Sequence, residues 1–128
     1  MIVSVFSVLL IDAANVVGSR PTGWWRDRAT AADQFVGRVR AATAASRLTP
    51  PIVVVLEGVA RQGVEEGVAD GVEVVHAHDH GDDALVALAE GASESVVLVS
   101  ADRELGDRCR AVGSEVVGPN WLLDRLMQ

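Results

Sequence analysis

Residues 2–11, with the sequence IVSVFSVLLI, form an almost wholly apolar run that is followed at once by Asp12. Two later runs have the same form, IVVVL at residues 52–56 and VVLV at residues 96–99. None of the three shows a regular alternation of polar and apolar residues, so they predict strands that are covered on both faces, as in a parallel sheet. Shorter strands of this kind are predicted at residues 72–75 and 115–117.

Helix-like segments separate these runs. Apolar residues recur at helical spacing within residues 30–47, 83–90, 102–112 and 119–127. Thr30 and Asp33 give the first of these helices a start that resembles a capping box, and we expect Trp121 to pack the last helix onto the sheet. The glycine-interrupted residues between 57 and 71 predict a short or irregular helix. Strand–helix alternation with right-handed crossovers therefore predicts an α/β fold, a three-layer sandwich around a five-stranded, mainly parallel sheet, as one domain over residues 1–128.

The charged residues exclude several functions. All 11 basic residues are arginines, so a phosphate loop with its lysine, Schiff-base chemistry and Ser–Lys catalysis are excluded. The formal net charge of −7 argues against binding nucleic acid through bulk positive charge. It does not argue against a metal site, because carboxylates are ligands there.

The single cysteine and the apolar residues 2–11 indicate in which cellular compartment the protein is expected. Cys109 has no partner for an internal disulfide and lies on the apolar stripe of its helix, which predicts a core residue in a reducing compartment. Residues 2–11 are too short to span a bilayer and lack the charged start of a signal peptide. We therefore expect a cytoplasmic protein without a membrane segment.

Four aspartates lie where an open parallel sheet binds ligands. Asp12 follows the first strand, Asp102 comes shortly after the fourth, and Asp82 and Asp83 open the helix that leads into the fourth. Ligands in such sheets bind beyond the carboxyl ends of the strands, where the strand order reverses. If the first and fourth strands are neighbours there, Asp12 and Asp102 face each other, and the crossover can bring Asp83 alongside.

Converging carboxylates repel one another, so such a cluster either raises a pKa or binds a divalent cation. Oxygen ligands favour Mg²⁺ or Mn²⁺, and a metal held in this way can generate hydroxide for phosphate hydrolysis. A structural role competes with this hypothesis, because Asp82, Asp83 and Asp102 each suit the N-cap of a helix. At Asp12 a functional role is favoured, because no helix is evident after it and burying it unpaired is costly.

Four strings occur in an order and spacing that resemble the PIN-like nucleases, specifically their NYN branch. They are IDAANV at residues 11–16, GWWRD at residues 23–27, GDDALV at residues 81–86 and VSADREL at residues 99–105. The resemblance covers almost the whole chain. It implies a PIN-like fold with strand order 3-2-1-4-5 and a ribonuclease that depends on Mg²⁺ or Mn²⁺, with RNA as its partner.

The resemblance also implies roles for single residues. Asn15 matches the asparagine of an Asp-x-x-Asn motif, and Asp83 matches the central helix-starting acid, with Asp82 as the alternative. The implied catalytic residues are Asp12, Asn15, Asp83, Ser100 and Asp102, and the implied metal ligands are Asp12, Asp82, Asp83 and Asp102. A further acid found in an early helix of many PIN-like nucleases has only Asp33 as a candidate here, which leaves one or two metal ions open.

Two other functions are compatible with the same residues. One is hydrolysis of a nucleotide phosphoanhydride, as in a nucleotide pyrophosphohydrolase, at the same acidic site. The other is a catalytically silent module that keeps the fold and binds RNA or a protein. The oligomeric state stays open, a homodimer being one arrangement that PIN-like domains adopt.

A local basic and aromatic cluster interrupts the acidic sequence at Arg20, Trp24, Trp25, Arg26 and Arg28. Arginine pairs with phosphate and tryptophan stacks on bases, so this loop is the candidate for binding single-stranded RNA. In the competing interpretation one tryptophan anchors the loop in the core and the arginines pair with nearby acids. We expect one tryptophan to be buried and the other to be partly exposed.

Three histidines, His76, His78 and His80, follow the third predicted strand. In an extended chain their imidazoles would share one face and could bind Zn²⁺ or Ni²⁺. A solvated loop is the favoured interpretation, because no cysteine or spaced fourth ligand accompanies them. Glu57 ends the second strand and is interpreted as a surface acid, with a supporting role at the acidic site as the alternative.

Overall fold

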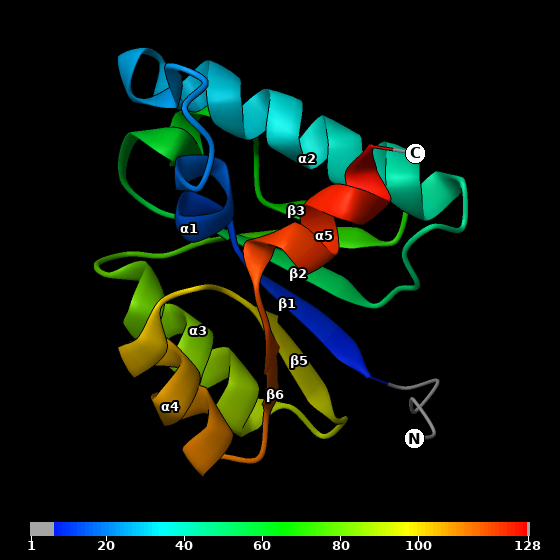
Figure 1. Ribbon diagram of the computed structural model, residues 1–128, viewed down its shortest axis with the longest axis vertical. Coiled ribbons are helices and arrows are strands. Elements are labelled where there is room, and N and C mark those ends of the chain that lie inside the picture. Colours follow the sequence, from blue (N-terminus) through cyan, green and yellow to red (C-terminus); the bar gives the residue numbers. More distant parts are fainter. Residues whose placement is uncertain (1–6, 128) are drawn as a thin grey trace.

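A six-stranded sheet lies at the centre of the computed structural model, which describes residues 7–127 (Figure 1). The strand order is β3-β4-β2-β1-β5-β6, and all neighbours are parallel except β3 and β4. The strands are β1 (Val8–Asp12), β2 (Ile52–Leu56), β3 (Gly67–Ala69), β4 (Val72–His76), β5 (Val96–Val99) and β6 (Glu115–Val117). The five parallel strands have the predicted order 3-2-1-4-5, so the expected α/β sandwich is confirmed.

The sheet has six strands where five were predicted. The additional strand β3 contains three exposed residues, so no apolar run marks it in the sequence. Asp70 and Gly71 join it to β4 with φ angles of 54° and 79°. A two-residue hairpin turn needs this left-handed backbone, and Asp-Gly is a sequence signal for it. That dipeptide was the available evidence for the antiparallel edge strand.

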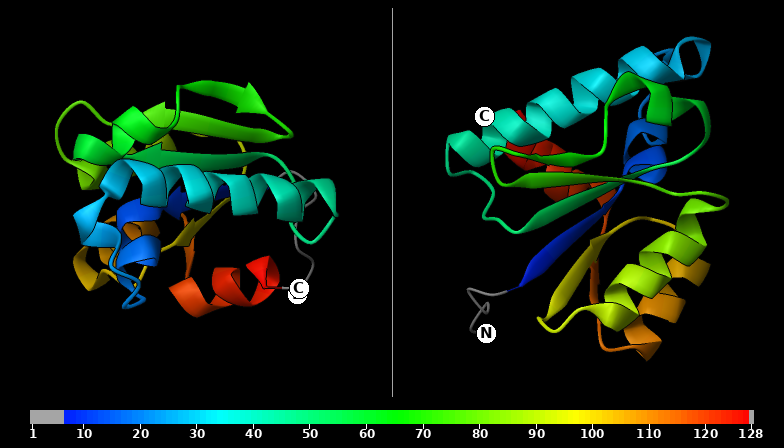
Figure 2. Two further views of the ribbon diagram at one scale, coloured as in Figure 1. Left: turned by 90° about the horizontal axis from the view of Figure 1, so that it is seen from above. Right: turned by 180° about the vertical axis from the view of Figure 1, so that it is seen from behind.

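Helices cover both faces of the sheet, as Figures 1 and 2 show. Side chains of α1, α2 and α5 join the core on one face, and side chains of α3 and α4 join the core on the other. The helices are α1 (Ala13–Gly18), α2 (Arg28–Ala44), α3 (Gly81–Gly91), α4 (Arg103–Ala111) and α5 (Pro119–Leu126), with 3-10 segments η1 (Trp24–Arg26) and η2 (Gly58–Gly63). The predicted short or irregular helix after β2 is η2.

The central strand β1 is buried on both faces. Leu9 and Ile11 belong to the core beneath α1, α2 and α5, whereas Leu10 belongs to the core beneath α3 and α4. Successive side chains of a strand point to opposite faces, so a strand between two cores needs apolar residues at every position. This explains the unbroken apolar run. Residues 2–6 of the predicted first strand lie outside the described residues.

Two helix starts differ from the prediction. A helix, α1, begins directly after Asp12, where none was predicted; it is only six residues long, and its valines and glycine are weak helix formers. Asp12 is its N-cap, so the expectation that no helix follows Asp12 is wrong, and Asp12 has a structural role as well. Helix α2 begins at Arg28, and Asp27 is its N-cap, with Oδ1 accepting a hydrogen bond from the Thr30 amide at 3.0 Å. The cap is therefore formed by Asp27 and not by the predicted pair Thr30 and Asp33.

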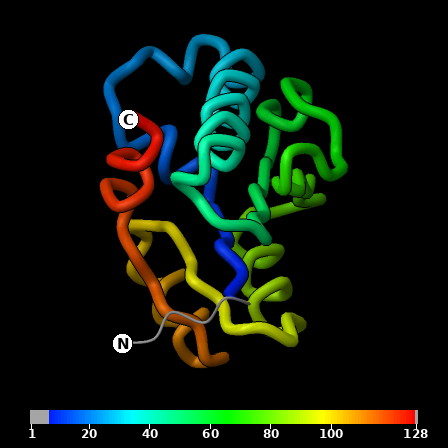
Figure 3. The backbone as a smooth tube through the Cα atoms, turned by 90° about the vertical axis from the view of Figure 1, so that its right-hand side faces the viewer, coloured from blue at the N-terminus to red at the C-terminus, as the bar shows by residue number. Residues whose placement is uncertain are grey.

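Two predicted core residues lie where expected. Cys109, a residue of α4, is fully buried in the core on its side of the sheet, and the half-buried Trp121 of α5 packs against the core on the opposite face. Figure 3 shows the loop between α1 and α2 at the end of the molecule away from α4. None of the helices formed by residues 7–127 is long and apolar enough to cross a membrane.

Candidate active site

The strand order reverses at β1, which has β2 on one side and β5 on the other. The chain leaves β1 for β2 and β4 on one side and returns to β5 on the other. Loops therefore separate at the carboxyl ends of β1 and β5, where open α/β sheets bind ligands. Asp12 is the last residue of β1 and is only 7% exposed, so a buried carboxylate lies at this point.

Asp12 is held by hydrogen bonds from the loop after β5. Ser100 Oγ donates to Asp12 Oδ2 at 2.9 Å, and the Asp102 amide donates to Ser100 Oγ at 3.1 Å. Asn15 lies one turn along α1: its backbone N–H donates to Asp12 Oδ1 at 3.4 Å, and its side-chain Oδ1 accepts from the Ala101 backbone N–H at 2.7 Å. Four of the five catalytic residues that the resemblance implied thus belong to one connected network.

The pKa of Asp12 is raised to about 6. Burial is the main cause, and the negative charges of Asp82 and Glu57 add to it. The hydrogen bonds from Ser100 and Asn15 act in the opposite direction but do not offset it. Burial and like charge both disfavour the ionised carboxylate, which is the electrostatic condition expected of a site that binds a cation or transfers a proton.

The two adjacent acids that open α3 have different surroundings. Asp83 is exposed and accepts a hydrogen bond from Arg108 at 3.0 Å, which forms an ion pair on the outer surface. Asp82 is less exposed, and its pKa is raised by partial burial and then by the charges of Asp102 and Glu57. The structure therefore brings Asp82, and not Asp83, into the electrostatic environment of Asp12.

Asp102 has a structural role as well. Its Oδ1 accepts from the Leu105 amide at 3.0 Å, so it is the N-cap of α4. The half-buried carboxylate still contributes to the raised pKa of Asp82. The structural and functional interpretations of Asp102 are thus compatible, because one carboxylate oxygen caps the helix and the other is free of that bond.

Glu57 is half-buried, and its interpretation as a surface acid is wrong. Its Oε2 accepts from the Gly81 amide at 2.6 Å, which joins the end of β2 to the start of α3. A Cβ at Gly81 would lie 2.7 Å from the same oxygen, so a larger residue there would displace the Glu57 carboxylate from its present position. The signal that could have identified Glu57 is its position at the carboxyl end of the strand next to β1.

Within residues 7–127, no three or more His, Cys, Asp or Glu side chains are grouped so that they could hold a metal ion. The predicted convergence of Asp12, Asp83 and Asp102 on one cation is therefore not formed. The negative charges of Asp12 and Asp82 are nevertheless suited to binding a cation, because no arginine forms an ion pair with them among the described residues. The two ion pairs of the described residues, Arg108 with Asp83 and Arg110 with Asp107, leave out Asp12 and Asp82. Mg²⁺ commonly keeps several waters and uses one or two carboxylates, so a complete protein cage is not required.

The three histidines do not form a metal site. His76 ends β4, and its Nε2 lies 2.7 Å from the Val64 carbonyl oxygen. His78 and His80 are exposed in the bend that follows. The chain is extended only as far as His76, so the alternation that would align the imidazoles is lost.

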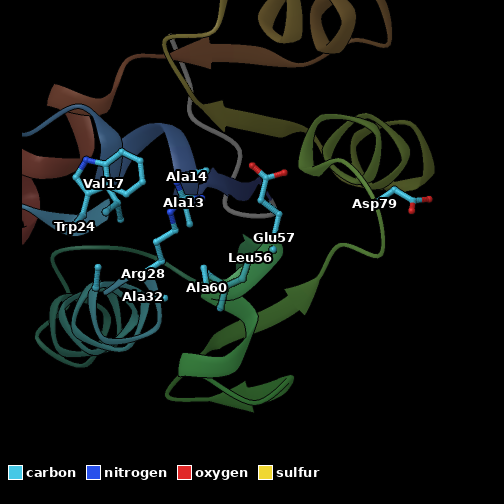
Figure 4. Close-up of a pocket in the computed structure, with 12 residues that line it drawn as sticks. Ala13, Ala14, Val17, Trp24, Arg28, Ala32, Leu56, Glu57, Ala60 and Asp79 are labelled. Atoms are coloured by element: carbon cyan, nitrogen blue, oxygen red, sulfur yellow. The ribbon is translucent and has the colours of Figure 1, made fainter. Parts of the chain in front are cut away.

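A pocket of about 380 Å³ adjoins the acidic residues (Figure 4). Trp24 forms part of its wall and is half-buried, whereas Trp25 is 52% exposed, so the partly exposed tryptophan is confirmed but neither tryptophan is fully buried. The Arg28 guanidinium lies 5.4 Å from the Trp24 ring centre, and that of Arg26 lies 5.7 Å from the ring centre of Trp25. Arg20 Nη2 donates to Asn120 Oδ1 at 3.2 Å. None of these arginines takes part in an ion pair between described residues.

The parallel core with this strand order and a buried aspartate at the end of its central strand define an open α/β fold with a candidate site at the point where the strand order reverses. Among solved structures, the chain is similar to Rae1 (YacP) from Bacillus subtilis, in a mutant form, with a TM-score of 0.70 and 17% sequence identity. The similarity covers 94% of this chain and 75% of that one. No family model and no curated protein sequence matches the chain.

Proposed function

We propose that the protein is a metal-dependent ribonuclease of the PIN-like class. The observation that carries the proposal is the buried Asp12 at the carboxyl end of the central strand. The like charges of Asp82 and Glu57 disfavour its ionised form. Such an arrangement lowers the stability of the folded protein unless a cation or a proton neutralises it. It is therefore better explained by function than by packing.

Asp12 and Asp82 would hold the ion, and Asp102 lies close enough to influence Asp82. A bound Mg²⁺ or Mn²⁺ ion supplies a Lewis acid and lowers the pKa of a bound water. Ser100 fixes the rotamer of Asp12 through its hydrogen bond to Oδ2. Asn15 fixes the loop after β5 by accepting from the Ala101 amide.

The arginines of the loop before α2 and at its start would supply a local positive charge in a chain whose formal net charge is −7. Arg20, Arg26 and Arg28 are exposed, and the exposed Trp25 offers a ring on which a base can stack. Stacking requires an unpaired base, so single-stranded RNA is the proposed substrate.

The test is cleavage of a labelled single-stranded RNA with Mg²⁺ or Mn²⁺, beside a panel of nucleoside triphosphates. We expect cleavage of RNA by the wild type, loss of cleavage in Asp12→Asn, and retention in Asp107→Asn, a control that removes an exposed acid of α4. Release of pyrophosphate from a triphosphate without RNA cleavage would favour the pyrophosphohydrolase instead. RNA binding without either reaction would favour a silent module.

A further inference from the structure

The 380 Å³ pocket beside the acidic site is not used in the metal-dependent step proposed above, although Arg28, one of the proposed RNA contacts, lines it. Residues of α1, α2, η1 and η2, the end of β2 and Asp79 line this open pocket, as Figure 4 shows. Ala13 lines it and directly follows Asp12, and Glu57 lines it while also raising the pKa of Asp12. The pocket is therefore continuous with the site at which the phosphodiester would be cleaved.

The lining is suited to a flat aromatic ligand. Five of the lining residues are alanines, which leave open space, and Trp24 supplies an aromatic wall. The Trp24 ring packs closely on α1, because a Cβ at Gly18 would lie 3.4 Å from it. Planar bases stack on such rings.

The polar groups of the lining differ in kind from one side to the other. Figure 4 shows Arg28 beside Trp24 on one side and Glu57 on the other. Arg28 offers only hydrogen-bond donors, and a Glu57 carboxylate offers only acceptors. Glu57 Oε2 is bonded to the Gly81 amide, and no hydrogen bond from another described residue reaches Oε1.

We propose that this pocket binds a guanine base of the RNA, next to the phosphodiester that is cleaved. Guanine carries the acceptors O6 and N7 on one edge, which match the arginine fork. It carries the donors N1–H and N2–H₂ on the neighbouring edge, which match the free carboxylate oxygen. Adenine places a donor where guanine has O6, and the pyrimidines lack N7, so both fit Arg28 less well. The inference rests on the proposed function for its RNA substrate.

The direct test is binding of mononucleotides without metal, followed through the indole N–H signals of the three tryptophans in two-dimensional NMR. The Trp24 signal is identified by its loss in Trp24→Phe. We expect GMP to shift the Trp24 signal and to bind at least ~10-fold more tightly than ribose 5-phosphate, which lacks a base. AMP binding that equals GMP binding would overturn the guanine assignment. GMP binding no tighter than that of ribose 5-phosphate would overturn the pocket itself.

Two variants separate the pocket from general effects. Ala60→Leu fills the pocket and should abolish the preference for GMP over ribose 5-phosphate, whereas Ala87→Leu, at an exposed position of α3, should leave it unchanged. Arg28→Gln changes an exposed side chain and should lower GMP affinity ~10-fold more than AMP affinity, because any lost phosphate contact is common to both nucleotides. An unchanged GMP preference in Arg28→Gln would contradict the role of Arg28, even if Ala60→Leu does not fold.

The binding test does not depend on hydrolysis. If the wild type binds GMP at Trp24 but cleaves no RNA, the ribonuclease proposal fails and the base pocket stands. If the wild type cleaves RNA and shows no base-dependent binding, the pocket proposal fails and the ribonuclease proposal stands.

Discussion

Asp82 and Asp83 are neighbours in sequence, yet they belong to two different surfaces of the molecule. Asp83 lies on the outer surface of α3, where Arg108 pairs with it at 3.0 Å. Asp82 lies toward the carboxyl ends of the strands, where Asp102 and Glu57 raise its pKa. On the outer surface the negative charge of Asp83 is paired with an arginine. At the edge of the sheet Asp82 lies near other negative charges.

The difference shows which carboxylates carry information about function. A solvated ion pair such as Arg108 with Asp83 is worth little in stability and needs no further explanation. Unpaired carboxylates around a buried carboxylate lower the stability of the folded protein, so their presence together is better explained by a ligand. Position relative to the sheet, and not residue type, separates the two groups.

The largest expected effect tests the two aspartates against each other. Asp82→Asn should lower the rate of RNA cleavage by ~100-fold or more, because a metal-bound transition state loses several kcal/mol of stabilisation. Asp83→Asn should stay within ~3-fold of the wild type, because only a surface ion pair is lost. Rates measured at saturating Mn²⁺ provide the comparison. The opposite order of effects would assign the central acid to Asp83.

A smaller effect concerns stability and its dependence on pH. The folded pKa of Asp12 is about 6 against an ordinary value of 3.8, so the folded protein binds the proton more tightly than the unfolded chain. Stability of the wild type should therefore fall as pH rises from about 4 to about 6 and stay lowered above that. Asp12→Asn removes this penalty and should be more stable at pH 8 by about 2–3 kcal/mol.

Urea unfolding in EDTA at pH 4 and at pH 8 measures this difference. The gain should be present at pH 8 and absent at pH 4. Asp107→Asn, which removes an exposed acid of the balanced surface, should show no such gain at either pH. A destabilised Asp12→Asn protein at pH 8 would mean that the site is built for stability.

The next prediction compares two buried serines, Ser100, which donates a hydrogen bond to Asp12, and Ser114, which has no hydrogen-bond partner among the described residues. Ser100→Ala removes the donor to Asp12 and should lower Mn²⁺ affinity or cleavage by ~10- to 100-fold. Ser114 is also buried, but its Oγ has no hydrogen-bond partner among the described residues, so Ser114→Ala should leave both unchanged. Equal effects of the two substitutions on activity would contradict the proposal that Ser100 positions Asp12.

The smallest expected effect lies in the loop before α2. Trp25→Ala removes a ring that is 52% exposed and should weaken RNA binding by ~5- to 10-fold, the value of one stacked base, with no change in stability. Fluorescence anisotropy of a labelled RNA measures this change. Val59→Ala, which shortens another exposed apolar side chain, serves as the control. Unchanged RNA affinity in Trp25→Ala would confine RNA binding to the other residues of the site.

Much of the fold could be predicted from the sequence, because strands buried on both faces need unbroken apolar runs. The strands at 52–56, 96–99 and 115–117 have their predicted bounds. The edge strand β3 and helix α1 could not be found in this way. Both are short, and neither has the apolar periodicity on which the prediction depends.

The candidate site was predicted in part. Asp12, Asn15, Ser100 and Asp102 form one network, which follows from their positions at the ends of β1 and β5. The choice between Asp82 and Asp83 could not be made from sequence, because it depends on how the first turn of α3 is rotated about its axis. The position of Glu57 at the end of β2 hinted at a role, but its hydrogen bond to Gly81 depends on the approach of α3, which lies 24 residues further along the chain.

The central claim is that Asp12, at the end of β1, and the nearby Asp82 bind a divalent cation. Titration of the protein with Mn²⁺, with free Mn²⁺ measured by electron paramagnetic resonance, tests it without any assumption about the substrate. We predict that the wild type and Asp83→Asn bind Mn²⁺ alike and that Asp12→Asn binds at least ~10-fold more weakly. Equal affinity in the wild type and Asp12→Asn, or no binding by the wild type, would contradict the claim.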